Sequence, residues 1–242
     1  MKKQLVLLPG WAMHSAMWGD FATQLSQQYT LTLIEHLPSH DTLDEVGDSI
    51  MAMLHDEPFY LLGWSLGGNV ALNLAQRYSA RVQGVILLAS NPCFVANDIW
   101  MGMPLVMFRA FAQQIQIDAN ATLQRFLAVQ CQGIVRGDEQ LEKLNARFAS
   151  KEAMSLNDLM QGLSLLENDD LRDTLANLTC PIMAILSDSD RLVPVEIGQA
   201  MQVLQPNLQL HLIEGAGHIP FLVDTQGCVN IVRAFIDGIR EN

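Results

Sequence analysis

Residues 58–75 have the sequence PFYLLGWSLGGNVALNLA. The apolar first part predicts a buried strand, and the part after the glycines is compatible with a helix. Ser65 therefore stands at the tip of a strand–turn–helix unit, in the G-x-S-x-G pattern of a nucleophile elbow. Gly63 and Gly67 fit this assignment because so sharp a turn strains the serine backbone and leaves no room for a neighbouring Cβ. A glycine-rich turn with a capping serine is the alternative, and the flanking strand and helix favour the catalytic interpretation.

Further short apolar runs predict more buried strands, and most of them are separated by segments of helical period. Such β-α-β alternation is typical of an α/β fold with a mostly parallel sheet, here of about six strands with helices on both faces. The interval 91–179 is different, because it has helical patterns, no convincing strand and too much length for a crossover. We expect a core of residues 1–95 and 172–242, with a helical cap inserted at 96–171. The expected strands lie at 4–8, 30–34, 58–63, 83–89, 181–186 and 208–213.

Composition and charge narrow the class of protein. Half of the 242 residues are hydrophobic, which is enough for one large core. The net charge of −12 argues against nucleic acid and anionic membrane as partners. No apolar stretch approaches the roughly 20 residues that cross a bilayer, and Pro9-Gly10 ends the first apolar run too early for a secretion signal. The four cysteines have neither metal-ligand spacing nor a disulfide pattern. We therefore expect a cytoplasmic protein without a metal.

A serine hydroxyl is inert near neutral pH unless a histidine takes its proton and a carboxylate orients that histidine. His218 follows the predicted strand at 208–213 on a glycine-flanked loop, which is the expected place for the base. The carboxylate should follow the strand at 181–186, where Asp188 and Asp190 compete. We favour Asp190, because the sequence Asp-x-Leu-Val-Pro places it at a loop tip. Asp188 stays open, and either residue could simply cap a turn.

The other five histidines are weaker candidates for the base. His211 lies inside its predicted strand, where a packed or edge position is expected. None of the remaining four follows a late strand. Among His14, His36, His40 and His55, only His14, near the loop of the first strand, could touch substrate.

Two backbone N–H groups are expected to bind the negative charge that forms on the attacked carbonyl. Leu66 supplies one, because it opens the helix directly after the serine. Trp11 supplies the other from the loop after the first strand, where Gly10 lets the backbone approach. The Trp11 indole either walls the pocket or packs in the core beside Trp64.

These residues resemble the α/β-hydrolase superfamily, whose members carry nucleophile, acid and base in the chain order Ser65, Asp190, His218. Over most of its length the chain is also similar to the pimeloyl-[acyl-carrier protein] methyl ester esterases of biotin synthesis (BioH type). The similar segments are GWSLGG at 63–68, ASNPCF at 89–94 with Trp100, RFLAVQ at 125–130 and GHIPF at 217–221.

The resemblance implies hydrolysis of the methyl ester on a pimeloyl chain carried by acyl carrier protein, without a cofactor. It also implies carboxylesterase activity on short model esters. Phe126 would line the acyl channel from the cap, beside Arg125 as a further substrate-binding residue, and ordinary cap packing is the alternative for Phe126. The remaining implied roles are Ser65 as nucleophile, His218 as base, Asp190 as its orienting acid, Trp11 and Leu66 as oxyanion amides, and Trp11 as a substrate contact.

The charge of the cap bears on the partner. Residues 125–151 hold five basic and three acidic side chains, a local excess of positive charge on an acidic chain. A basic cap face could dock an acidic carrier protein. A solvated amphipathic helix is the alternative. The basic residues are Arg125, Arg136, Lys143, Arg147 and Lys151.

Because the chain departs from the superfamily pattern in several places, more than one substrate is compatible with it. The chain reaches its oxyanion strand within a few residues of its start, has Pro9-Gly10 in place of the usual His-Gly, and lacks the usual Asp-x-Pro-Gly-x-Gly turn at 36–41. A different small ester, a lactone, a thioester or a ring-cleavage diketone is the first alternative. A noncatalytic ligand-binding protein of the same fold is the second, and the intact serine, acid and base disfavour it.

Overall fold

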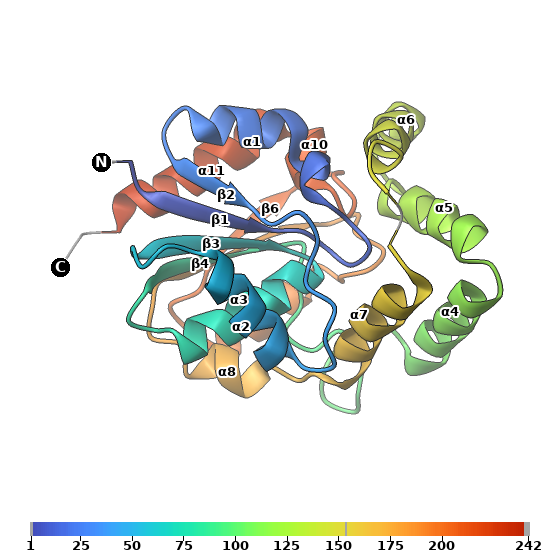
Figure 1. Ribbon diagram of the computed structural model, residues 1–242, viewed down its shortest axis with the longest axis horizontal. Helices are drawn as coiled ribbons and strands as arrows, with labels where there is room; N and C mark the ends of the chain where they lie inside the picture. The colour runs from blue at the N-terminus through green and yellow to red at the C-terminus, as the bar shows by residue number, and fades with distance from the viewer. Residues whose placement is uncertain (1, 153, 240–242) are drawn as a thin grey trace.

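A six-stranded sheet forms the centre of the computed structural model, which describes residues 2–152 and 154–239 (Figure 1). Every neighbouring pair of strands is parallel, in the order β2-β1-β3-β4-β5-β6. Each of the six predicted strands is confirmed, with ends that differ by one residue at most. The strands are β1 (Gln4–Leu8), β2 (Thr30–Leu33), β3 (Phe59–Trp64), β4 (Val82–Leu88), β5 (Ile182–Ser187) and β6 (Gln209–Ile213).

Helices cover both faces of this sheet. Every residue of β3 and β5 is buried, so neither face of the central strands is left to solvent. Helices α1 and α11 pack together on one face, and α2, α3 and α8 lie on the other (Figure 1). Helix α9 packs against α8 and β6. Their bounds are α1 (Gly19–Ser26), α2 (Leu43–Met53), α3 (Leu66–Arg77), α8 (Arg172–Ala176), α9 (Ile197–Leu204) and α11 (Thr225–Gly238).

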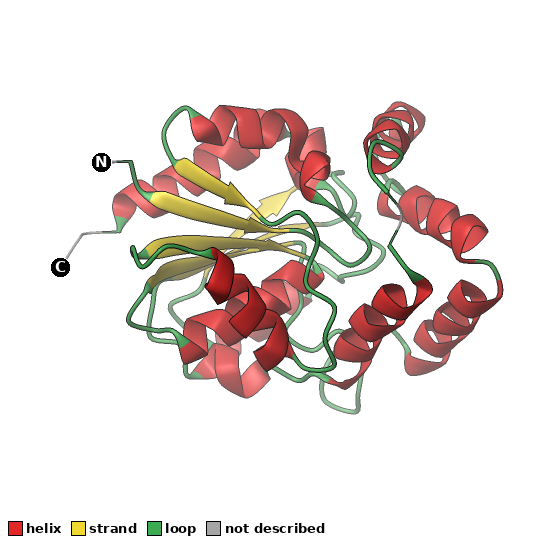
Figure 2. Cartoon of the chain, viewed as in Figure 1, coloured by secondary structure: helices red, strands yellow, loops and turns green. Residues whose placement is uncertain are grey.

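In the described part of the chain, four helices lie beyond the carboxyl ends of the strands, where the cap is predicted, and we call them the cap (Figure 2). They are α4 (Leu105–Ile117), α5 (Ala119–Gln130), α6 (Gly137–Phe148) and α7 (Leu156–Asn168). All four fall inside the predicted insertion, while the limits 96 and 171 stay a prediction. Within the described residues, none of the helices has the length and apolarity to span a bilayer.

An aromatic cluster lies under the carboxyl end of β3. The ring of Phe221, from the short helix α10 (Pro220–Val223), lies 4.9 Å from Trp18 and 5.0 Å from Trp64. Trp18 ends the 3-10 helix η1 (Ser15–Trp18), and Phe21 of α1 completes the cluster. All four side chains are almost fully buried. Because Trp64 is the last residue of β3, this packing fixes the point from which the chain turns into the elbow.

Candidate active site

Ser65 joins β3 to α3 in a backbone conformation that L-residues rarely adopt, with φ 54° and ψ −121°. Glycine is needed at both flanking positions of the pattern, because the turn leaves no space there for a side chain. A Cβ on Gly63 would overlap the Gly67 carbonyl oxygen, and a Cβ on Gly67 would overlap the carbonyl of Leu8 at the end of β1. The elbow is therefore a strained turn that its neighbours hold in place.

Backbone and side-chain hydrogen bonds hold the strained serine. Its N–H donates to the Leu88 carbonyl at 3.0 Å, and its carbonyl accepts from the Gly68 N–H at 2.8 Å. The Ser90 hydroxyl, at the exit of β4, donates to the same carbonyl at 2.8 Å. Ser90 was not predicted as part of the site, because a serine after a strand is an ordinary turn residue.

Asp190 and His218 form a buried pair at the ends of β5 and β6. The Asp190 Oδ2 lies 2.7 Å from the His218 Nδ1, and both side chains are no more than 2% exposed. The other carboxylate oxygen accepts from the N–H groups of Leu192 and Val193, at 2.8 and 3.1 Å. Asp188, the alternative acid, instead accepts from the Gly215 N–H at 2.7 Å. The geometry thus brings Asp190 and His218 together and leaves Asp188 outside the pair.

Three further side-chain oxygens hold the loop that carries His218. We call these contacts the acid–base ladder, because they join residues 187–189 to residues 215–217 one by one. Besides the Asp188 contact, the Ala216 N–H donates to Ser187 Oγ at 3.0 Å and the Gly217 N–H donates to Ser189 Oγ at 2.9 Å. The two hydroxyls are 3.2 Å apart. The ladder therefore holds the histidine loop by its backbone, independently of the contacts of the imidazole.

The His218 backbone is also held from both sides. Its N–H donates to the Gln130 carbonyl of α5 at 3.0 Å, and its carbonyl accepts from the Trp64 indole at 2.9 Å. The ring Nε2 is buried and has no hydrogen-bond partner among the described residues. No hydrogen bond joins it to the Ser65 hydroxyl within the described part of the chain. Such contacts are often made only once substrate is bound.

The predicted oxyanion loop lies directly against the elbow. A Cβ on Gly10 would be 3.3 Å from the Ser65 Cβ. The Trp11 N–H donates no hydrogen bond within the described chain, and Leu66, as the first residue of α3, has no acceptor inside the helix. Within the described residues, both N–H groups are therefore unpaired, and each belongs to a residue next to the serine or next to Gly10. The next residue, Ala12, has a positive φ of 60°.

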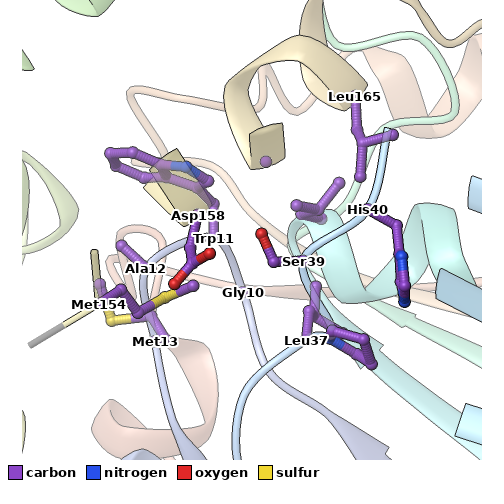
Figure 3. Close-up of a pocket in the computed structure, with 13 residues that line it drawn as sticks. Gly10, Trp11, Ala12, Met13, Leu37, Ser39, His40, Met154, Asp158 and Leu165 are labelled. Carbon is purple, nitrogen blue, oxygen red and sulfur yellow. The ribbon is translucent and has the colours of Figure 1, made fainter. Parts of the chain in front are cut away.

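The Trp11 side chain faces the cap. Its indole N–H donates to the Leu159 carbonyl of α7 at 2.8 Å, and its ring lies 5.1 Å from Phe126 and 5.5 Å from Phe111. A small cavity of about 20 Å³ borders this residue and Leu66 (Figure 3). That volume holds about one water molecule. The cavity is also lined by the loop 37–40 and by Met154, Asp158 and Leu165.

Comparisons with known proteins show the family of this chain. The α/β hydrolase fold family matches residues 3–225. The chain belongs to the α/β hydrolase fold family. It is 33% identical to a pimeloyl-[acyl-carrier protein] methyl ester esterase of Methylococcus capsulatus, over 96% of this chain and 94% of that protein. The protein of the same name from Aeromonas salmonicida is 35% identical over the same shares.

Solved structures show the same fold. An esterase from Exiguobacterium antarcticum superposes with a TM-score of 0.87 at 20% identity, covering 97% of this chain and 92% of that one. The enol-lactonase from Burkholderia xenovorans LB400 has a TM-score of 0.80 at 14% identity, covering 98% and 92%. These two structures show the fold alone. The esterase relatives at 33% and 35% identity show that this hydrolase is a carboxylic ester hydrolase.

The two predicted substrate contacts in the cap of this hydrolase, Phe126 and Arg125, have different surroundings. Phe126 packs against the Trp11 ring, whereas Arg125 is exposed on the outer surface of α5. Part of the predicted basic face is engaged elsewhere. Arg136 pairs with Glu139, Lys151 with Glu35, and Arg147 donates to the Met17 carbonyl. Arg125 and Lys143 are exposed and make no such contact within the described residues.

The other histidines lie away from the Asp190 pair. His211 lies in the edge strand β6, as expected, and His40 contacts the Ser49 hydroxyl at 2.7 Å. His14 is buried beside the oxyanion loop with its Nε2 3.2 Å from the Phe148 carbonyl. Among the residues that the structure describes, no cluster of His, Cys, Asp and Glu is arranged to hold a metal ion.

Proposed function

We propose that this hydrolase is a serine carboxylesterase whose substrate is the methyl ester of pimeloyl-[acyl-carrier protein]. The observation that carries the chemistry is the 2.7 Å contact between Asp190 and His218. The imidazole Nε2 has no hydrogen-bond partner among the described residues, and the ring lies 6.0 Å from that of Trp64, the residue before Ser65. A carboxylate on Nδ1 keeps the proton on that nitrogen, so that Nε2 can accept one. The name shared by the relatives at 33% and 35% identity supports the choice of substrate.

The reaction follows from these groups in two steps. The Ser65 hydroxyl turns toward His218 Nε2, which takes its proton as Oγ attacks the ester carbonyl. The N–H groups of Trp11 and Leu66 bind the oxyanion, and the imidazolium gives its proton to the departing methoxide, which leaves as methanol. Water activated by the same nitrogen then hydrolyses the acyl-enzyme and releases the free carboxylate. No cofactor takes part in this sequence.

A biotin auxotroph that lacks its pimeloyl esterase tests the proposal. The wild-type gene should restore growth without biotin, and Ser65→Ala should not. Ser26→Ala is the matched control, because that exposed hydroxyl only donates to the Thr23 carbonyl on α1. Methanol release from dimethyl pimelate by the purified protein gives the same comparison in vitro. Soluble wild-type protein that neither restores growth nor releases methanol would contradict the proposed substrate.

The exposed cations of the cap allow a test of whether acyl carrier protein docks there. Arg125 and Lys143 are exposed cations on an otherwise acidic protein, and a local positive patch is enough to attract an acidic partner. The double variant Arg125→Glu and Lys143→Glu should raise KM for the carrier-bound ester more than for dimethyl pimelate, and the difference should shrink at high salt. Equal effects on both substrates would argue against docking at this face.

A further inference from the structure

The elbow carries a further glycine, Gly68, which the G-x-S-x-G pattern does not require. It is the third residue of α3. A Cβ on Gly68 would be 2.2 Å from the Ser90 Oγ and 2.6 Å from the Ser90 Cβ, which is too close for any side chain. Ser90 is only 1% exposed, so it has no open space to move into. Glycine at position 68 is therefore what lets the Ser90 hydroxyl lie against the elbow.

The chain on both sides of Ser90 is held by hydrogen bonds. Ala89, which follows β4, has a positive φ of 46°, and its N–H donates to the Ile185 carbonyl of β5 at 2.9 Å. On the other side, the Asn91 carbonyl accepts from the side-chain amide of Asn69 in α3 at 3.2 Å. Both neighbours of Ser90 are thus tied to elements of the core. The hydroxyl between them has a defined place beside the elbow.

Ser90 acts on the peptide unit whose N–H is a predicted oxyanion donor. The Ser65 carbonyl accepts from the Ser90 hydroxyl and from the Gly68 N–H, both at 2.8 Å, and a carbonyl oxygen has two lone pairs to offer. The Ser65 carbonyl and the Leu66 N–H belong to one planar trans peptide unit and point in opposite directions. The two hydrogen bonds that orient the carbonyl therefore also orient the Leu66 N–H, which has no acceptor inside α3.

We propose that Ser90 is a positioning residue of the oxyanion site, which holds the Ser65–Leu66 peptide unit so that its N–H points at the oxyanion. The proposal rests on the serine mechanism proposed above. Without the Ser90 hydroxyl, only the Gly68 N–H restrains the carbonyl, and the peptide unit at this strained turn is free to tilt. The Leu66 N–H also loses the polarisation that a hydrogen bond on its carbonyl provides. Both effects weaken a contact that is strongest in the transition state, where the oxygen carries most charge.

Steady-state kinetics with p-nitrophenyl butyrate tests the proposal. Ser90→Ala should lower kcat about tenfold with little change in KM, because losing an oxyanion donor outright costs about 10²–10³ and Ser90 only orients one. Ser90→Cys keeps the size of the side chain with a weaker donor, so its kcat should lie between those of wild type and Ser90→Ala. Thr174→Val is the matched control, because that buried hydroxyl donates to Gln76 Oε1 at 3.1 Å, and it should leave kcat unchanged. Thermal melting verifies that each variant is folded, and either Ser90 variant suffices.

Two ketones distinguish positioning of the oxyanion donor from a general loss of structure. With hexyl trifluoromethyl ketone, the Ser65 Oγ adds to the carbonyl carbon, the hydroxyl proton goes to His218 Nε2, and the electron pair of the C=O π bond becomes the oxyanion. Hexyl methyl ketone has the same alkyl chain, but its carbonyl is not activated for addition. Ser90→Ala should raise Ki for the trifluoromethyl ketone about tenfold, in step with the loss of kcat/KM, and should leave Ki for the methyl ketone unchanged.

The outcomes separate this proposal from the proposed function. A folded Ser90→Ala with wild-type kcat, a change confined to KM, or an equal rise in Ki for both ketones overturns Ser90 as a positioning residue, even if dimethyl pimelate is hydrolysed. A loss confined to kcat and to the trifluoromethyl ketone, without hydrolysis of dimethyl pimelate, supports the role of Ser90 and contradicts the proposed substrate. The same loss together with hydrolysis of dimethyl pimelate supports both.

Discussion

At the rim of the core, side chains make the hydrogen bonds that hold His218 and its loop, whereas the described cap residues make their hydrogen bonds to Trp11, His14 and His218 through backbone carbonyls. The acid–base ladder uses two hydroxyls and a carboxylate, and Asp190 adds another carboxylate. From the cap, three carbonyls contact site residues: those of Gln130, Leu159 and Phe148. A side-chain contact depends on residue identity, and a backbone contact depends on the path of the chain. We therefore expect point substitutions to affect the site far more at the rim than in the cap.

The largest effect is expected at the buried carboxylate. Asp190→Asn should lower kcat about 10⁴-fold, because the amide no longer selects the tautomer with the hydrogen on Nδ1 of His218. Asp188→Asn keeps an oxygen that can accept from Gly215 and should change kcat by less than about threefold. Hydrolysis of p-nitrophenyl butyrate measures both variants. Equal losses in the two would contradict the assignment of Asp190.

The elbow glycine gives the next largest effect, on stability. Gly67→Ala forces a Cβ against the backbone carbonyls of Leu8 and Pro9, which cannot move without shifting the sheet. We expect the free energy of unfolding to fall by about 3 kcal/mol or more in a urea titration. Gly238→Ala, where a Cβ meets nothing within 4 Å, is the control and should be neutral or slightly stabilising. Similar values for the two would show that the elbow is less crowded than its contacts indicate.

A smaller effect is expected where α7 of the cap returns to the core. Burial, with a lesser contribution from Asp44, raises the pKa of Asp169 to about 6. The folded state therefore prefers the neutral carboxyl, so this group stabilises the fold below about pH 4 and that contribution is lost as the pH rises through 6. Asp169→Asn mimics the neutral form and should gain about 1–3 kcal/mol over wild type at pH 8, but little at pH 4. Melting curves at both values measure it, with exposed Asp56→Asn as control; a gain independent of pH would contradict the prediction.

The smallest predicted effect is on kcat, and it is tested by comparing one serine of the rim with one serine of the cap. Ser189→Ala removes the acceptor for the Gly217 N–H, a loss of about 1 kcal/mol that should lower kcat about fivefold with little change in KM. Ser150→Ala is the cap control, because its hydroxyl donates only to the Arg147 carbonyl. Steady-state kinetics with a short ester distinguishes them. A similar fall in kcat for both serines would remove the contrast between rim and cap.

The sequence predicts the sheet well because its strands are continuous apolar runs. It also predicts the elbow, since Gly63 and Gly67 leave few other structures open to the chain. Residue type and position after a strand predict Asp190 and His218 as the acid and the base. The structure brings the two into contact, while their catalytic roles stay predictions. The fold and the positions of the principal candidate residues can thus be predicted from the sequence.

The contacts that hold the site were not predictable in the same way. Ser187 and Ser189 look like ordinary turn residues, and only the folded chain sets them opposite residues 216 and 217. The cap contacts are made by backbone carbonyls, which every residue type carries. The sequence allows Trp11 to pack beside Trp64, but its indole faces Phe111 and Phe126 of the cap. Pairings between distant segments need the path of the chain as well as its residue types.

The most direct test of the central claim is the site at which a fluorophosphonate reacts. Mass analysis of the digested protein should find one added phosphonyl group, on the peptide that contains Ser65. His218→Ala should slow the labelling at least about 100-fold, because the hydroxyl then has no base. A label on another residue, or unchanged labelling of Ser65→Ala, would contradict the account.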